Sequence, residues 1–268
     1  MGRLDLTDAL RAEYRTMFDT SSITASRQTA VEGLVASLIA NKARYEAVAQ
    51  PLGMPWHVVA VIHNMESSQS FSKHLHNGDP LTARTVHVPA GRPRTGSPPF
   101  TWEESATDAL TMHGFASWHD WTVAGTLYQI ECYNGTGYRL YHPDVKTPYL
   151  WSFCNWYTAG KYVADGTWSQ TATSSQCGAA VLLRRMAEKQ LIGFTDEPLP
   201  DPANGPLVVK YMTAKPSDPK LIADGTALQT WLNTHTGIHL KIDGWAGKGT
   251  SDAYKTVSGN YLPGDPRA

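Results

Sequence analysis

Apolar positions recur at helical spacing between residues 31 and 48, and this pattern predicts an amphipathic helix closed by Pro51 and Gly53. Directly after it, residues 55 to 65 are apolar on nearly every side. Such a helix is typical of a domain core, and Pro55 suits its first turn. One acid, Glu66, stands at the predicted C-terminal end of this helix.

The next segment changes period from helical to alternating. SFSKHLH, residues 70 to 76, alternates apolar and polar side chains and runs into Asn77-Gly78, a strong signal for a two-residue hairpin turn. We therefore expect a β-hairpin whose second strand covers residues 81 to 88. The Gly-, Pro- and Ser-rich residues 91 to 99 predict a loop.

Further helices follow along the chain. Thr101 and Glu104 form a capping-box pattern that predicts a helix reaching about His113. Helices are also expected over 118–132 and 176–190, with an irregular, aromatic-rich segment between them.

The composition after residue 195 shifts to Pro, Asp, Gly and Asn, which predicts a linker, although VVKYM within it fits a short strand. We expect a mainly α domain with a small β-hairpin over residues 1–195. A linker over 196–219 and a small helical domain over 220–268 should follow.

Composition limits the function classes. The chain has 268 residues, of which 41% are hydrophobic, so it can bury a substantial core. Its formal net charge of -1 argues against a partner held by bulk charge, such as DNA or an anionic membrane. The three cysteines are widely spaced and lack a CxxC pair, which disfavours a disulfide framework or a cysteine zinc site.

Glu66 is the candidate with the clearest chemical reason. A carboxylate at the C-terminal end of an apolar helix meets the negative end of the helix dipole and loses hydration, and both effects favour the protonated form. Cleavage of a glycosidic bond needs such an acid to protonate the departing oxygen near neutral pH. The alternative is a solvated Glu at a helix end without a catalytic role.

A second group would hold or activate water, and Asp79, just past the predicted turn, is the best candidate carboxylate in the sequence. Because Asp79 lies beyond a helix end and a strand, we expect the longer acid–base separation of an inverting hydrolase. Asp79 is equally suited to stabilising the turn through its own hydrogen bonds.

Several motifs together resemble the lysozyme superfamily, with lytic transglycosylases and goose-type lysozymes nearest. These are Glu66-Ser67-Ser68 at a helix end, YNGTGY from Tyr133, and the later TPYLW. The runs HNGDPLTARTVHVPAGRP and FTWEESATDAL are similar to bacterial and phage "lysozyme family" proteins. The resemblance covers roughly residues 25 to 190.

The resemblance implies a lysozyme-like α+β domain in which Glu66 is the catalytic acid and Tyr133 and Asn134 line the cleft. It also implies that the hairpin after Glu66 carries a water-holding acid or hydroxyl, and Thr82 and Thr85 are the candidate hydroxyls. The chain departs from the transglycosylase pattern, because CYNGTG replaces the Ala-rich motif and a "GLMQ" segment is absent. Hydrolysis is therefore at least as well supported as the anhydro-forming reaction. Aromatic rings near the second motif suit a saccharide groove. The expected substrate-binding residues are Ser68, His76, Asn77, Thr85, Tyr133, Asn134, Tyr149 and Trp151.

The C-terminal segment is similar to a peptidoglycan-binding domain with a pattern of LQ, LN, DG, G, T and A. Its expected wall-binding residues are Leu228, Gln229, Asn233, Asp243 and Gly244. The alternative is a helical appendage packed on the main domain.

Two other classes remain open. His63, His74, His76 and His87, with Asp79, form a possible zinc set of a wall amidase, but no HExxH or comparable motif supports it, and we expect no metal or other cofactor. The second open class is a non-catalytic wall-binding protein.

The main expectation is a peptidoglycan hydrolase that cleaves the β-1,4 bond between N-acetylmuramic acid and N-acetylglucosamine, with chitin as the alternative substrate. We expect a monomer that binds no nucleic acid and no membrane. The N-terminal residues lack the apolar run of a signal peptide, so we expect synthesis in the cytoplasm and later release to the wall.

Overall fold

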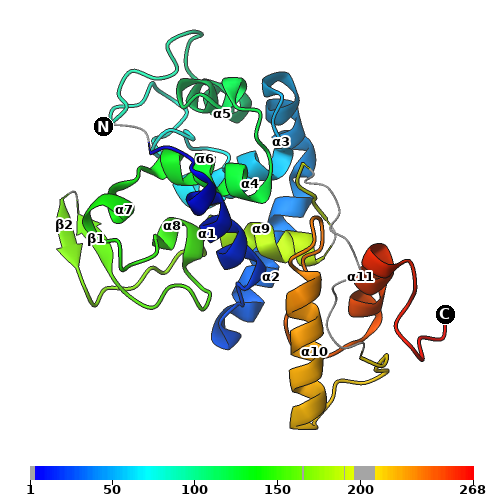
Figure 1. Ribbon diagram of the computed structural model, residues 1–268. Coiled ribbons are helices and arrows are strands. Elements are labelled where there is room, and N and C mark those ends of the chain that lie inside the picture. Colours follow the sequence, from blue (N-terminus) through cyan, green and yellow to red (C-terminus); the bar gives the residue numbers. More distant parts are fainter. Residues whose placement is uncertain (1–3, 165, 190, 196–208) are drawn as a thin grey trace.

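The computed structural model describes residues 4–164, 166–189, 191–195 and 209–268, and within these ranges the chain is mainly helical with a small two-stranded hairpin (Figure 1). The larger part contains α1 (Asp8–Asp19), α2 (Gln28–Ala40), α3 (Lys42–Ala49), α4 (Trp56–Ser67), α5 (Trp102–Met112), α6 (Val123–Asn134), α7 (Gly137–Tyr141), α8 (Pro148–Trp151), β1 (Lys161–Ala164), β2 (Thr167–Ser169) and α9 (Ala179–Glu188). Short 3-10 turns lie at Ala25–Arg27, Gln50–Leu52 and Phe115–Ser117. The mainly α class with a small hairpin is thus confirmed.

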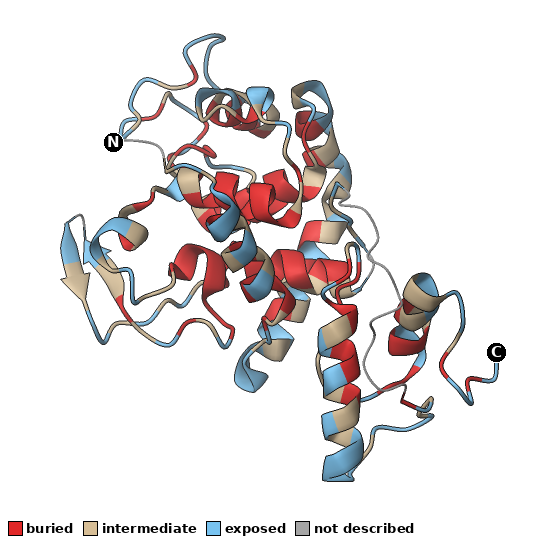
Figure 2. Ribbon diagram, viewed as in Figure 1, coloured by how far each residue is buried: buried red, intermediate tan, exposed pale blue. Residues whose placement is uncertain are grey.

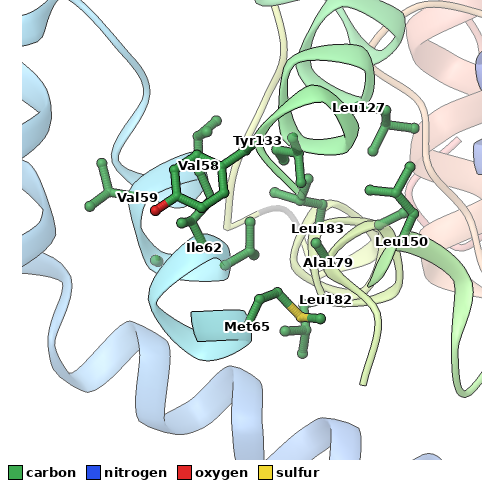
Figure 3. Packing of buried hydrophobic residues seen from close by; sticks show 14 of the residues in the cluster. Val58, Val59, Ile62, Met65, Leu127, Tyr133, Leu150, Ala179, Leu182 and Leu183 are labelled. Carbon is green, nitrogen blue, oxygen red and sulfur yellow. The ribbon is translucent and has the colours of Figure 1, made fainter. Parts of the chain in front are cut away.

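Helix α4 runs through the core, as its all-round apolar pattern predicts. Val58, Val59 and Ile62 are fully buried, and α4 packs against α3, α6 and α9 (Figure 2). Figure 3 shows its side chains packed with those of α6, α8 and α9. Because the helix is buried along its length, its last turn carries Glu66 to the edge of the core.

Two predicted helix boundaries are wrong. The helix expected over residues 31 to 48 is divided at Asn41, whose side-chain amide donates to the Ser37 carbonyl oxygen at 2.9 Å and competes with the backbone ladder. The helix expected from 118 begins instead at Val123, where the Thr122 hydroxyl caps the Gly125 amide. The capping box of Thr101 and Glu104 is confirmed at α5.

The β-hairpin lies elsewhere than predicted. Asn77-Gly78 does form a tight turn, closed by the His74 amide donating to the Asp79 carbonyl oxygen at 2.6 Å, but only an isolated bridge between Lys73 and Pro80 extends it among the described residues. Beyond the turn the chain folds into a loop because side-chain acceptors bind its amides in place of a strand ladder. The strands are β1 and β2, which are antiparallel.

A second core builds the C-terminal unit around α10 (Pro219–Leu232) and α11 (Lys248–Ser258). Val209 belongs to this core, and the amides of Tyr211 and Met212 donate to carbonyl oxygens of Pro263 and Ala246 at 2.9 Å. Residues 209 to 212 are therefore part of this unit rather than linker, and they form no strand among the residues described. The rest of the predicted linker, residues 196 to 208, lies outside the described ranges.

The C-terminal unit lies against the larger domain (Figure 1), and buried polar side chains connect the two. Arg184 of α9, 2% exposed, donates to His239 Nδ1 at 3.4 Å. Arg15 of α1 donates to the Asn233 carbonyl oxygen at 3.3 Å, and the Asn233 amide donates to the Asp19 carbonyl oxygen at 3.4 Å. These hydrogen bonds and the burial of Arg184 couple the two units physically. Across the described ranges, no helix is long and apolar enough to cross a membrane.

Candidate active site

Glu66 lies in the last turn of α4, at a sharp change of backbone direction. Ser68 and Gln69 both adopt left-handed conformations, with φ of 51° and 63°. Non-glycine residues avoid this region unless the surrounding structure holds them there, and such strain gathers at functional sites. The Gln69 side chain helps to hold it by donating to Asn64 Oδ1 at 2.9 Å.

The environment of Glu66 favours its protonated form. Loss of hydration raises the pKa of Glu66 to about 7, and the hydrogen bond from the Tyr149 hydroxyl only partly opposes this rise. Tyr149 Oη donates to Glu66 Oε1 at 2.7 Å. A carboxyl group with this pKa can hold a proton near neutral pH and give it up within that range, as a general acid must.

Gln176 closes the end of α4 next to Glu66. Its amide Nε2 donates to the carbonyl oxygens of Met65, at 2.6 Å, and Asn64, at 3.1 Å. A helix end leaves its last carbonyl groups without an intrahelical partner, and Gln176 supplies a donor to that of Met65 and a second donor to that of Asn64, which also accepts the Ser68 amide at 3.2 Å. The contact ties the segment before α9 to the turn that carries the acid.

A groove of about 440 Å³ opens beside this helix end. Its lining combines aromatic rings, amide and hydroxyl groups and one lysine, a mixture suited to a polar ligand with apolar faces. It is lined by Met65, Asn134, Gly135, Gly137, Tyr138, Pro148, Tyr149, Lys161, Tyr162, Ser174 and Gln176. Met65 and Tyr149 place Glu66 at its margin, since one precedes Glu66 in the chain and the other is bonded to it.

One wall of the groove is an aromatic cluster joining the hairpin to α7. The Tyr138 and Tyr162 rings meet edge to face with centroids 5.5 Å apart, and His142 stacks on Trp168 at 3.5 Å. The Tyr162 amide also donates to Tyr138 Oη at 3.4 Å. These contacts fix β1 against α7, so the hairpin is a firm wall of the groove.

The residues predicted around the second motif divide between groove and core. Asn134 and Tyr149 line the groove. Tyr133 is buried, donating its hydroxyl to the Leu75 carbonyl oxygen at 2.8 Å, but it lies near enough to Glu66 for the carboxylate charge to help raise the Tyr133 pKa. Trp151 is 1% exposed and packs in the core, so the expectation that it covers a sugar is wrong.

Asp79 is engaged in holding a loop. Its Oδ2 accepts the backbone amides of Val86 and His87 at 2.8 and 3.0 Å, and its Oδ1 meets His87 Nδ1 at 2.6 Å. The bonds from His87 and Val86 outweigh the loss of hydration and lower the Asp79 pKa to about 2. Both oxygens are thus occupied by the chain itself, and Asp79 is outside the described lining of the groove.

The neighbouring candidates Thr85, His76 and Asn77 also form hydrogen bonds within the protein. Thr85 is buried, donating to the Pro89 carbonyl oxygen at 2.6 Å and accepting the Arg92 amide at 2.9 Å. His76 Nε2 meets Asp108 at 2.8 Å, and the Asn77 amide donates to the His87 carbonyl oxygen at 3.0 Å.

Thr82 and Ser68 are not buried in the core. The turn itself does approach the acid, because a Cβ on Gly78 would come within 3.3 Å of the Glu66 carbonyl oxygen. None of Ser68, His76, Asn77, Thr82 and Thr85 is among the described residues that line the groove.

The histidines of the alternative zinc set have other partners. His74 contacts the Ser105 hydroxyl at 2.7 Å, and His63 contacts the Tyr45 hydroxyl at 3.1 Å. Burial lowers the pKa of His63 to about 4. In the part of the chain that the structure describes, no three His, Cys, Asp or Glu side chains form a group that could hold a metal ion.

The residues matched to the wall-binding pattern hold the C-terminal fold together. Gln229, 2% exposed, accepts the amides of Asp243 and Gly244 at 2.9 Å and donates to Asp243 Oδ1 at 3.1 Å. Leu228 is buried in the second core, and Asn233 accepts the Leu240 amide at 2.6 Å. Of the five, Gln229 and Asp243 also reach a surface groove, whereas Leu228, Asn233 and Gly244 have positions that stabilise the fold.

Sequence reasoning missed Gln176, Lys161 and Ser174. They come from segments far along the chain from Glu66, and nothing local in the sequence indicates that they return to the end of α4. Tyr138 and Tyr162, by contrast, belong to the aromatic rings near the second motif, which the sequence already associates with a saccharide groove.

Comparisons of the chain with models of protein families, with curated proteins and with solved structures find no match.

Proposed function

We propose that the protein is a peptidoglycan hydrolase that cleaves the β-1,4 bond between N-acetylmuramic acid and N-acetylglucosamine, with Glu66 as general acid. One observation carries the proposal: a carboxyl group with a pKa of about 7 lies at the margin of a groove lined by aromatic and amide groups. The resemblance of the Glu66-Ser67-Ser68 and YNGTGY motifs to lysozyme-superfamily enzymes supports the same reaction.

In the proposed reaction, protonated Glu66 gives its proton to the glycosidic oxygen as the bond from that oxygen to the anomeric carbon breaks. Water adds to the anomeric carbon and releases a proton, and Glu66 regains a proton from solvent. Tyr149 keeps Oε1 in place through its hydrogen bond. The partly exposed Tyr162 ring lines the groove and can cover an apolar sugar face.

The inverting route expected from the sequence gives Asp79 the role of water-holding base. The bonds that occupy both Asp79 oxygens favour a role in the loop over that role. The proposal therefore assigns the chemistry to Glu66 and leaves Asp79 out of the reaction.

Mass spectrometry of purified sacculi and of chitin, each digested by the full chain, tests the function. Reducing N-acetylmuramic acid ends are expected, and Glu66→Gln should release none. New N-acetylglucosamine reducing ends would assign a different bond, 1,6-anhydro ends would identify a transglycosylase, and cleavage of chitin alone would identify a chitinase. No glycan cleavage by the wild-type chain would contradict the proposal.

We also propose that the C-terminal unit contributes to wall binding. A groove of about 330 Å³ between α9 and this unit is lined by Arg185, Tyr211, Lys241 and Trp245, among others, and Trp245 is 39% exposed. Trp245→Ala should weaken sedimentation with sacculi about three- to ten-fold, since an aromatic contact contributes about 0.5–1.5 kcal/mol. Leu221→Ala, at an exposed site on α10, is the control, and equal binding by both variants would contradict this role.

A further inference from the structure

Among the described residues that line the groove beside Glu66, Lys161 alone carries a charge. Its companions are aromatic, amide, hydroxyl and apolar groups. A lone ammonium group in such a groove gives the site a preference for a ligand with a negative group.

The Lys161 ammonium group has no salt-bridge partner among the residues that the structure describes. Other lysines of the same domain are paired. Lys146 meets Glu13 at 2.8 Å, and Lys189 meets Glu32 at 2.7 Å. The charge of Lys161 is thus available to a ligand, whereas those of Lys146 and Lys189 are engaged within the protein.

The backbone holds Lys161 in place. Gly160, with φ of 98°, precedes it, and a Cβ there would come within 2.9 Å of the Trp168 ring. The Gly160 amide donates to the Ala172 carbonyl oxygen at 2.9 Å, and Lys161 pairs with Ser169 across the hairpin. The position at the start of β1 is therefore fixed by close packing and by the strand pair.

We propose that Lys161 binds a carboxylate carried by the polymer in the groove and thereby selects carboxylate-bearing glycans over neutral chitin. This inference rests on the proposed function, because it assigns the substrate class of the same site. A glycan with lactyl ether groups presents carboxylates either on the lactyl groups themselves or on the peptides attached to them. Chitin presents neither.

Calorimetric titration of the Glu66→Gln chain, which should not turn the ligand over, separates these ligands. Three probes are needed: a peptide-free oligosaccharide of alternating N-acetylglucosamine and N-acetylmuramic acid, the same oligosaccharide with attached peptides, and an N-acetylglucosamine oligomer of equal length. Adding Lys161→Gln should weaken binding of at least one charged probe about five-fold at low salt, since a partly exposed ion pair contributes about 1 kcal/mol or less.

The loss should shrink as salt rises, because screening weakens exposed charge pairs. Binding of the neutral oligomer should change less than about two-fold. Lys220→Gln, at an exposed position on α10, removes the same charge outside the groove and should change none of the three affinities. The charged probe that responds identifies the lactyl or the peptide carboxylate as the partner.

Equal loss for charged and neutral probes, or no loss for any, would overturn the inference. If the wild-type chain digests sacculi while Lys161→Gln leaves all affinities unchanged, the inference fails and the proposed function stands. If no probe binds and the wild-type chain does not digest sacculi, both fail.

Discussion

Glu66 and Asp79 are carboxyl groups on neighbouring segments, and the structure gives them opposite surroundings. Asp79 accepts two backbone amides and faces an imidazole, and its pKa is lowered to about 2. Glu66 receives one tyrosine hydroxyl at a helix end where hydration is lost, and its pKa is raised to about 7. The number of hydrogen-bond donors around each carboxylate therefore distinguishes Asp79, which stabilises a loop, from Glu66, which can give up a proton.

The largest expected effect is on activity at Glu66. Glu66→Gln keeps the shape of the side chain and deletes the proton donor, so dye release from sacculi should fall by about a hundred-fold or more. Circular dichroism should show an unchanged fold. If dye release fell only a few-fold, Glu66 would no longer be distinguished from Asp79 as the catalytic acid.

The next effect is on stability at Asp79. Asp79→Asn replaces a charged acceptor of backbone amides, so we expect a loss of about 1–2 kcal/mol in the free energy of unfolding by urea, with dye release changed only a few-fold. A hundred-fold loss of dye release with unchanged stability would instead give Asp79 a catalytic role.

The stability difference between wild type and Asp79→Asn should depend on pH. Because the folded-state pKa of Asp79 lies below its ordinary value of 3.8, the carboxylate stabilises the fold above that value, and this contribution is lost as pH falls toward about 2. The stability difference between wild type and Asp79→Asn should shrink over this window. A difference that is constant from pH 5 to about 2 would contradict the role of the charge.

The smallest expected effect is at Tyr149. Tyr149→Phe removes the bond that opposes the rise in the Glu66 pKa, so the alkaline limb of the pH–activity profile should move upward by about one unit. Tyr162→Phe removes a hydroxyl from the groove without removing the bond to Glu66, and it should leave that limb in place. A shift in the opposite direction would mean that Tyr149 stabilises the protonated acid.

The sequence predicted features that depend on local patterns. The all-round apolar run of α4 placed Glu66 at a buried helix end, and the Thr101 and Glu104 pair marked the start of α5. The Asn77-Gly78 signal predicted the turn correctly, but the second strand expected after it is a loop, because Asp79 and Thr85 bind backbone amides that a strand would need.

The rest of the site depends on distant packing. Lys161 and Gln176 reach the groove only because the hairpin packs on α7 and the segment before α9 caps α4. Trp151 illustrates the same limit of the sequence. An aromatic residue beside a motif can lie in the core or in the groove, and only the packing of the folded chain shows that Trp151 lies in the core. The wall-binding pattern likewise marked residues that build the C-terminal turn, as Gln229 does.

The stability of Glu66→Gln relative to wild type measures the pKa of Glu66 without any assay of activity. Because the folded-state pKa is raised, the wild-type chain should lose stability relative to the variant as pH rises from the ordinary value of 4.5 to about 7. Urea unfolding should show the variant gaining about 1–3 kcal/mol over this range and no more above it. A stability difference that does not change with pH would contradict the account.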